Sequence, residues 1–359
     1  MSTAVRFDAV SVVFGTAPQT ALPLMDDGQS RAEVEAATGQ ILGVHDCSLE
    51  VASGEIVVLM GLSGSGKSTL LRAVNGLNPV IRGAVHVAEG EAMVDVSHAD
   101  ARTLRRIRQN TIAMVFQQFA LLPWRSVREN VGLGLELGGM ARRTRTAKVE
   151  EQLALVGLSD WADRPVGELS GGMQQRVGLA RAFVTDAPIL LMDEPFSALD
   201  PLIRARLQDE LLMLQERLNR TIVFVSHDLD EAFKIGNRIA IMEGGRIVQC
   251  GTPAEIFSKP TNDYVADFVA HMNPLGVLSA RDVMDAAAPD FTPAEHVAAD
   301  TKVDAVMRAV LGAPGPLGVT EDGAVIGQIT RDAILRRLLD PRAESATSGD
   351  DSSGAQRAG

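Results

Sequence analysis

The sequence predicts an α/β protein in which helices cover both faces of a mostly parallel sheet, and three observations support this fold class. Short apolar runs such as PILLMDEP and RTIVFVSH alternate with helical patterns. A glycine-rich loop joins the apolar run EIVVLM to the helical run STLLRAV. The stretch from Asp100 to about Gly178 has mainly helical patterns with charged faces. We therefore expect a helical subdomain, at about residues 100–178, inserted into an α/β core.

The N-terminal elements come before the glycine-rich loop. The run VRFDAVSVVFG predicts a first strand. The stretch 16–43 predicts a helix, because Ser30 and Glu33 have the spacing of a capping box and Gly39 is suited to end the helix. Strand signals return in LGVHDCSLEVASGEIVVLMG. A long insert with its own helix therefore lies between the first strand and the loop.

The remaining elements follow the loop. Gly76 and Pro79 end the helix after it, a second helix extends from about Pro201 to Asn219, and RIAIMEGGRIVQ predicts further strands. Around residues 271–278 the pattern changes, and PLGVTEDGAVIGQITRDAILRRLL predicts two short strands, an Asp-Gly turn and a helix. We expect a core at residues 1–270, a small α/β lobe at 271–340 and a disordered polar tail at 341–359.

Composition excludes several classes of protein. The net charge of −12 disfavours a dominant nucleic-acid role, and the basic clusters Arg102–Arg108 and Arg142–Lys148 are expected to be solvated helix faces. Cys47 and Cys250 lack metal-ligand spacing, which fits reduced thiols. The N-terminus does not have the layout of a signal peptide, and runs such as IVVLMGL are too short to span a bilayer. We expect a soluble cytoplasmic chain that works at a membrane from one side only.

The stretch GLSGSGKS, Gly61–Ser68, satisfies the phosphate-loop pattern. At average composition, a chance match in such a chain is on the order of one in a hundred. The glycines let backbone N–H groups wrap phosphates, and the helix N-terminus adds a favourable dipole field. We expect Lys67 to reach the β- and γ-phosphates and the Ser68 hydroxyl to bind Mg²⁺.

Two carboxylates follow an apolar strand in ILLMDE, at Asp193 and Glu194. Ionised carboxylates there are costly unless something uses them. In a phosphate-loop protein Asp193 suits Mg²⁺, usually through water. Glu194 can orient or deprotonate an attacking water. The pair therefore predicts hydrolysis of the bound nucleotide.

A second anion-binding pattern lies in LSGGMQQR, Leu169–Arg176, where a serine and two glycines open a helical pattern. Met173 has helical spacing with Val177 and Ala180, so we expect it to pack in the interior rather than contact a nucleotide. One chain thus has two candidate phosphate sites.

In these motifs the chain resembles the ATP-binding subunit of ABC transporters, over roughly Val5 to Val269. VFQQF resembles the family's Q-loop, with Gln117 as the matching glutamine, and LSGGMQQR resembles its signature. SALD, which ends at Asp200, resembles the D-loop, and VSHD resembles the switch that holds His227. The motifs occur in the family's order. The resemblance implies a RecA-like P-loop NTPase core with ATP and Mg²⁺ as cofactors.

The resemblance also implies a role for each site residue. It implies that Glu194, His227 and Gln117 are catalytic. It also implies that Ser68, Gln117 and Asp193 bind Mg²⁺. Phe14 matches the aromatic residue that the family stacks on adenine, although the stretch after it is longer than in typical members. The residues expected to bind ATP within one subunit are Phe14, Gly61, Leu62, Ser63, Gly64, Ser65, Gly66, Lys67, Ser68 and Thr69.

The second phosphate site is explained by the same resemblance. In this family two subunits meet head to tail, and each ATP lies between the phosphate loop of one and the signature of the other. Binding of ATP thereby closes a clamp that hydrolysis opens. The residues expected to reach the partner's ATP are Ser170, Gly171, Gly172 and Asp200. Many members have glutamine where this chain has Met173.

Import is favoured over export. With no membrane span, the chain needs a separate integral permease, and GTPAEIFSKPTNDYVADF resembles the closing segment of bacterial importer ATPases. Three features resemble the quaternary-amine importers for choline, glycine betaine and proline betaine. They are the long insert before the phosphate loop, the run MGLSGSGKSTLLRAVNGLNPV and the run VFQQFALLPWRSVREN. VNGLNPV and FSALDPLIRARLQDELL are closest to choline-import ATPases. We expect a choline importer, with glycine betaine and proline betaine as the alternative.

The expected partners are a second copy of the chain, the permease and, indirectly, a periplasmic or extracellular substrate-binding protein. The chain would work at the cytoplasmic face of the inner membrane. A choline pocket needs aromatic faces around the cation, and this chain is only 4% aromatic, so the substrate must be recognised by its partners.

Relatives in this group often end in a pair of CBS modules that sense adenine ligands or ionic strength. GPLGVTEDGAVIGQITRDAILRRLL resembles one half-module, and RDVMDAAAPDFTPAEHVAADTKVDAVMRAVL supplies its preceding helices. A tandem pair does not fit in the remaining length. The lobe is therefore expected to be a single CBS-like unit, either dimer-stabilising or regulatory.

Two other functions compete with transport. A soluble ABC-type ATPase acting on nucleic acid or ribosomes usually has tandem ATPase halves or long coiled coils, whereas this chain has one phosphate loop, no heptad array and an acidic balance. A regulator that binds ATP without turnover would not need Glu194 and His227. Both are disfavoured.

Overall fold

The computed structural model describes residues 2–117, 120–197, 199–270, 274–288 and 291–339. The chain divides into two compact units, Met1–Thr252 and the part from Pro253 onward. The boundary predicted from the sequence is at residue 270 instead. Helices α11 (Pro253–Ser258) and α12 (Asp263–Val269) therefore group with the C-terminal unit.

A six-stranded sheet forms the centre of the first unit, in the order β10-β9-β3-β8-β7-β6. Neighbours from β9 to β6 pair in parallel, and β10 pairs antiparallel with β9. Three of these strands, β3, β7 and β8, are buried along their whole length, as strands covered on both faces must be. The predicted parallel sheet is thus confirmed. Its strands are β3 (Ile56–Met60), β6 (Ile112–Val115), β7 (Ile189–Asp193), β8 (Thr221–Val225), β9 (Arg238–Glu243) and β10 (Arg246–Gly251).

An antiparallel sheet of four strands, in the order β2-β1-β4-β5, accompanies the parallel one. One apolar core combines residues of both sheets with helix α3 (Lys67–Ala73). The apolar face of the helix that follows the phosphate loop is therefore fixed by this core. The antiparallel strands are β1 (Thr3–Phe14), β2 (Ile41–Ala52), β4 (Arg82–Glu89) and β5 (Ala92–Asp95).

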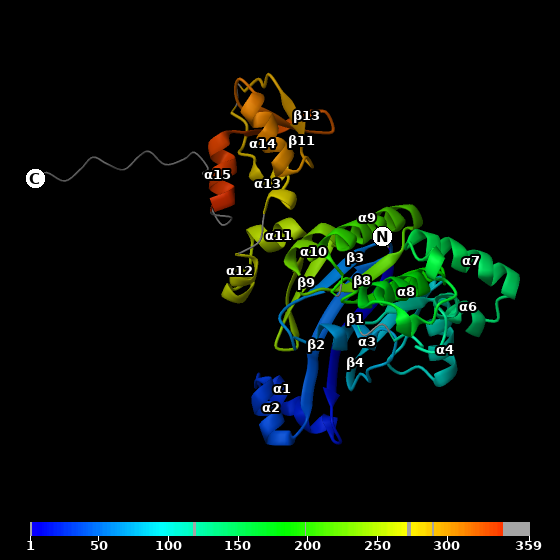
Figure 1. Cartoon of the computed structure of the whole chain (residues 1–359). Coiled ribbons are helices and arrows are strands. Elements are labelled where there is room, and N and C mark those ends of the chain that lie inside the picture. Colours follow the sequence, from blue (N-terminus) through cyan, green and yellow to red (C-terminus); the bar gives the residue numbers. More distant parts are fainter. Residues whose placement is uncertain (1, 118–119, 198, 271–273, 289–290, 340–359) are drawn as a thin grey trace, which may run out of the picture. The chain divides into compact units, whose positions relative to one another are not determined.

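The predicted insert forms a small helical cap at one end of the β1–β2 pair (Figure 1). It holds a 3-10 turn (Pro18–Ala21), α1 (Leu22–Asp26) and α2 (Arg31–Thr38). The capping box of Ser30 and Glu33 is present, and Gly39 ends α2 with φ of 67°. The cap has an apolar cluster of its own, made of Val13, Ala21, Met25, Val34 and Leu42.

The stretch 100–178 is less uniformly helical than expected. After α4 (Ala101–Asn110), the apolar run IAMV forms strand β6 at the edge of the parallel sheet, where β7 supplies its backbone partners. Helices α5 (Val127–Val131), α6 (Leu133–Leu137), α7 (Arg142–Leu155) and α8 (Gly171–Phe183) then share a separate apolar core. Short 3-10 turns lie at Ser159–Trp161 and Val166–Glu168. Met173 packs against this core, as predicted.

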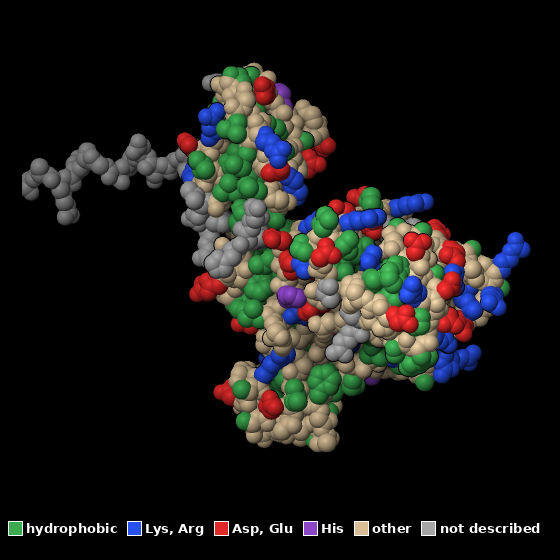
Figure 2. Space-filling view, in the orientation of Figure 1, with side chains coloured by type: hydrophobic (Ala, Val, Ile, Leu, Met, Phe, Trp, Pro, Cys, Tyr) green, Lys and Arg blue, Asp and Glu red, His purple; other side chains and the backbone are tan. Residues whose placement is uncertain are grey.

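Two further helices complete the first unit, α9 (Pro201–Leu218) and α10 (Leu229–Ile235). The basic clusters predicted as solvated faces lie on α4 and α7. Their arginines Arg102, Arg105, Arg142 and Arg143 are exposed, and blue side chains gather over this part of the surface in Figure 2. Among the described residues, no helix combines the length and apolarity that crossing a bilayer requires.

The C-terminal unit contains a three-stranded sheet in the order β11-β12-β13. Strands β12 (Leu317–Glu321) and β13 (Ala324–Ile329) form the predicted hairpin, with Asp322 and Gly323 at positive φ in its turn. The preceding stretch, predicted as helices only, also contributes a strand, β11 (His296–Ala298), parallel to β12. The unit's other elements are a 3-10 turn (Pro274–Gly276), α13 (Ala280–Val283), α14 (Val303–Gly312) and α15 (Arg331–Leu339). The predicted tail, 341–359, lies outside the described residues.

Candidate nucleotide site

The phosphate loop lies between β3 and α3, at the carboxyl end of the central strand. Gly61, Gly64 and Gly66 all have positive φ, of 145°, 80° and 101°. At Gly61 a methyl group would lie 2.2 Å from the carbonyl oxygen of Met242, so only glycine fits there. The predicted strand–loop–helix arrangement is present.

Lys67 points back into the loop. Its Nζ donates to the carbonyl oxygens of Gly61, at 2.8 Å, and Leu62, at 2.9 Å. Burial lowers the pKa of the Lys67 ammonium, and the negative charges of Glu194 and Asp193 oppose this shift. The Oγ of Ser65 is buried without a hydrogen-bond partner among the described residues. An ammonium and an unsatisfied hydroxyl in one glycine-rich loop fit an anion with several oxygens, such as a triphosphate.

Ser68 and Asp193, both predicted to bind Mg²⁺, lie in contact. The Ser68 Oγ donates to Oδ1 of Asp193 at 2.6 Å, and the Asp193 side chain is fully buried. The other carboxylate oxygen accepts a hydrogen bond of 2.8 Å from Arg72, a residue that the sequence analysis missed. Arg72 lies one helical turn after Ser68 on α3, and this i, i+4 spacing was the available signal. A hydroxyl and a carboxylate are oxygen donors that suit Mg²⁺.

Glu194 is the meeting point of the predicted catalytic residues. Gln117 Nε2 donates to its Oε2 at 3.0 Å, and Nδ1 of His227 lies 3.3 Å from the same oxygen. Glu194 has φ of 49°, in the left-handed region that non-glycine residues rarely adopt. A small cavity of about 20 Å³ beside Glu194 and His227 has room for one water molecule.

A polar network behind His227 holds the switch segment. Glu231 is buried, and it accepts hydrogen bonds from Ser226 Oγ at 2.6 Å and Gln208 Nε2 at 3.0 Å. Arg204 donates to Asp228 at 2.9 Å. Both Gln208 and Arg204 belong to α9, which begins after Asp200. The residues flanking His227 are thereby tied to the helix that follows the D-loop motif.

Phe14 lies at the end of β1, with 36% of its surface exposed. A methyl group on Gly43 would come within 3.0 Å of the Phe14 ring and 2.9 Å of the Thr69 side chain. The aromatic ring is therefore close to the residue that ends the predicted ATP-binding stretch. Its contact with adenine stays a prediction.

The signature residues lie at the start of α8. Ser170 is its N-cap and accepts from the N–H of Met173, while Gly171 is exposed and Gly172 half-buried. Asp200 similarly caps α9 and is exposed. In the described part of the chain, no hydrogen bond or ion pair joins Ser170–Gly172 to the phosphate loop. Their predicted action on a partner's ATP is compatible with this placement.

Gln175 connects the signature helix to the hydrolytic centre of its own subunit. Its side chain is 1% exposed, and its Nε2 donates to the carbonyl oxygen of Glu194 at 3.4 Å. The sequence alone predicts no role for Gln175. No spacing rule links residue 175 to residue 194, because the contact exists only once α8 packs beside the end of β7.

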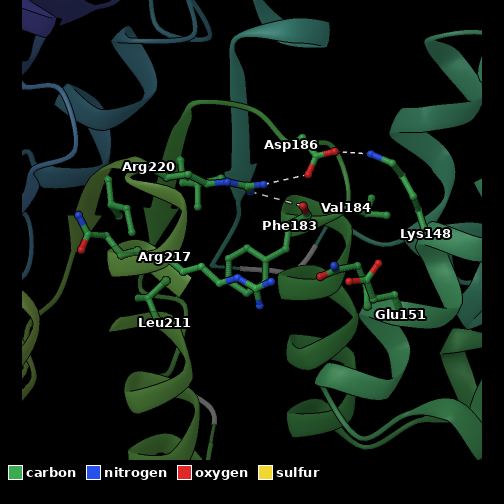
Figure 3. A pocket seen from close by; sticks show the side chains of 12 residues that line it. Lys148, Glu151, Phe183, Val184, Asp186, Leu211, Arg217 and Arg220 are labelled. Carbon is green, nitrogen blue, oxygen red and sulfur yellow. Dashed lines mark hydrogen bonds and ion pairs between the residues drawn. The ribbon is translucent and has the colours of Figure 1, made fainter. Parts of the chain in front are cut away.

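A larger cavity lies away from these residues, at the opposite ends of β7 and β8. Its volume is about 190 Å³, and its lining includes Leu190, Ile222 and Phe183 (Figure 3). Asp186 bridges Lys148 of α7 and Arg220 at its rim. None of the predicted site residues lines this cavity.

Comparison with known proteins finds similar sequences. The sequence profile described as ABC transporter matches residues 44–197. The chain is 51% identical over 271 residues to the glycine betaine/proline betaine transport system ATP-binding protein ProV of Salmonella typhimurium, which covers 76% of this chain and 67% of ProV. It is 43% identical over 328 residues to the trimethylamine N-oxide transport system ATP-binding protein TmoW of Ruegeria pomeroyi, which covers 91% of this chain and 94% of TmoW.

A solved structure is similar as well. It is a dimeric ATP-binding cassette in a post-hydrolysis state, bound to ADP and Pi. The TM-score is 0.60 at 30% identity, over 69% of this chain and 98% of that one.

Proposed function

The chain belongs to the ABC transporter family of ATP-binding proteins, and we propose that it powers an importer of small methylated amines by hydrolysing ATP. The observation that carries this proposal is the convergence of Gln117 and His227 on Glu194, beside the Ser68–Asp193 pair. Such a constellation suits hydrolysis, because it combines a base, a polarising partner and a metal site around one phosphate loop.

Each residue then has a role at the phosphates. Lys67 would leave the loop carbonyls and bind the β- and γ-phosphates, which relieves its buried charge. Ser68, Asp193 and Gln117 would hold Mg²⁺, which neutralises charge on the phosphates when bound. Glu194 would take a proton from the attacking water, and His227 would stabilise the γ-phosphate.

We further propose that two copies meet head to tail, so that Ser170, Gly171, Gly172 and Asp200 complete the partner's site. The exposed start of α8 supports this, because its free N–H groups and dipole favour a phosphate. A similar protein was solved as a dimer with ADP and Pi, which also supports the arrangement. The helical part, α5 to α8, would face an integral permease on the cytoplasmic side of the membrane.

The substrate proposal rests on the named relatives. ProV serves glycine betaine and proline betaine, and TmoW serves trimethylamine N-oxide. These compounds share a methylated nitrogen with choline, which the sequence analysis favoured. Since these names support the betaine alternative rather than choline, we propose a betaine or amine oxide as the first substrate to test. The matched region covers about two thirds of ProV, so its whole activity is not carried over.

Uptake by membrane vesicles that contain the chain with its permease tests this function. We expect ATP-dependent uptake of labelled glycine betaine or trimethylamine N-oxide to exceed that of choline. The Lys67→Ala variant should take up none of them. The proposal would be contradicted if the chain never co-purified with an integral membrane protein and if its ATPase rate did not change when such a protein was added. Preferential choline uptake would restore the sequence prediction.

A further inference from the structure

The insert between β1 and β2 reaches the phosphate loop through one side chain. Arg31 is the first residue of α2, next to the capping box that fixes the start of this helix. Its Nη1 donates to the carbonyl oxygen of Gly64 and its Nη2 to that of Gly43. One guanidinium thus bridges β2 and the loop that is proposed to wrap the phosphates.

The surrounding backbone is shaped to admit this guanidinium. A methyl group on Gly66 would lie 2.7 Å from the Gly43 oxygen and 3.3 Å from Nη2 of Arg31. A methyl group on Gly245, in the β9–β10 turn, would lie 3.0 Å from the same nitrogen. Both glycines have positive φ as well, of 101° and 89°. Any side chain at either position would crowd the arginine.

Placing the guanidinium of Arg31 at this position costs desolvation free energy. Its Nε is buried without a hydrogen-bond partner in the described part of the chain, and burial lowers the pKa of the guanidinium. A partly desolvated cation costs free energy unless an anion compensates it. No carboxylate among the described residues forms an ion pair with it. A triphosphate in the adjoining loop would supply the missing negative charge.

The second acceptor of Arg31, the carbonyl oxygen of Gly43, lies on the side of the site where adenine is proposed to bind. A side chain on Gly43 would crowd both Thr69 and the ring of Phe14, so these two residues lie beside the Gly43 position. Fixing the Gly43 carbonyl therefore also fixes the strand on which the proposed adenine platform rests. Arg31 is in this way connected to both ends of the nucleotide.

We propose that Arg31 is a positioning residue for ATP, which holds the Gly64 and Gly43 carbonyls and so prearranges the phosphate loop and the adenine platform. Prearrangement lowers the cost of ordering the loop on binding, and the guanidinium charge adds attraction for the triphosphate. The inference rests on the proposed nucleotide site. It gives the insert, whose function was otherwise unassigned, a direct part in nucleotide affinity.

Arg246 provides a matched control. Its Nη2 donates to the carbonyl oxygen of Met25 at 2.9 Å, so it also ties the insert to the core, but within the described part of the chain none of its hydrogen bonds reaches the phosphate loop. If Arg31 served only to anchor the insert, the Arg31→Ala and Arg246→Ala variants would behave alike. Melting temperatures of both variants are to be measured alongside, to establish that each variant is folded.

The test is titration of the full chain with a fluorescent ATP analogue, together with steady-state ATPase rates of its complex with the permease. We expect Arg31→Ala to raise Kd and KM about tenfold while kcat changes by less than about twofold. Arg31→Lys keeps the charge but not the two-pronged geometry, so its Kd should fall between those of wild type and Arg31→Ala. Arg246→Ala should bind the analogue as wild type does.

Two results would overturn the inference. One is wild-type affinity in Arg31→Ala, and the other is an equal loss in Arg246→Ala. Lys67→Ala separates this failure from failure of the proposed function. If Lys67→Ala loses binding and Arg31→Ala does not, only the role of Arg31 is wrong. If Lys67→Ala binds ATP normally, the proposed nucleotide site itself is wrong.

Discussion

The side-chain amide of Gln117 donates a hydrogen bond of 3.0 Å to the carboxylate of Glu194. Gln117 follows β6, at the edge of the parallel sheet, and precedes the helices α5 to α8. Glu194 follows β7, the neighbouring strand. The residue proposed to activate water is therefore held by the residue that leads into the helical part.

Gln117→Ala should uncouple hydrolysis from transport. The variant loses one proposed Mg²⁺ ligand but keeps the Ser68–Asp193 pair and the Glu194 carboxylate, so its ATPase rate should fall by much less than its uptake does. The connection from the site to the helical part, which is proposed to face the permease, is lost. Vesicle uptake and ATPase rate measured on the same preparation check this. Full uptake by the variant would contradict the coupling role.

The Arg72–Asp193 pair should contribute to stability before any nucleotide binds. Arg72→Met leaves one oxygen of a fully buried carboxylate without its charged partner, which should lower the unfolding free energy by about 1–3 kcal/mol. Adding Asp193→Asn removes the orphaned charge, so the double variant should lose less than the sum of the single variants. Urea unfolding without nucleotide measures the cycle. Strict additivity would show that the pair does not interact.

Glu231 should make the stability of the first unit depend on pH. Burial raises the pKa of the Glu231 carboxyl above its usual value, with hydrogen bonds from Ser226 and Gln208 opposing the shift. A raised folded-state pKa means that the neutral carboxyl is favoured in the fold. The contribution of Glu231 to the stability of the fold is therefore fully present below the usual glutamate pKa. This contribution is lost as the pH rises through the raised pKa of the folded state.

Glu231→Gln should remove this titration. The unfolding free energy of wild type, measured relative to Glu231→Gln, should fall as the pH rises from about 4 towards neutrality. The exposed Glu216 on α9 supplies the control, because Glu216→Gln should follow wild type at every pH. Parallel pH profiles of wild type and Glu231→Gln would rule the effect out.

The proposed centre of the site could be predicted from the sequence because its motifs carry their chemistry in local spacing. The phosphate loop, Asp193 and Glu194 are each recognisable from a few adjacent residues, and tertiary structure brings Gln117 and His227 to them as the resemblance implied. The capping box of α2 and the Asp-Gly hairpin were predictable for the same reason.

The residues that sequence reasoning missed act across long sequence separations. Arg31 reaches Gly64, and Gln175 reaches Glu194, only because an inserted helix and α8 pack beside the carboxyl ends of strands. Strand β6 was missed because four apolar residues between helical patterns do not distinguish a strand from a buried helix turn. In the fold, this segment is a strand because it pairs with β7.

The central claim is that ATP joins two copies of this chain. The most direct measurement is the mass of purified Glu194→Gln in solution, by light scattering, with and without ATP and Mg²⁺. Glu194→Gln keeps the phosphate loop and the signature but lacks the proposed base, so we predict a monomer without nucleotide and a dimer containing two ATP molecules with it. Glu194→Gln that stays monomeric with ATP, both alone and with its permease, would contradict the account.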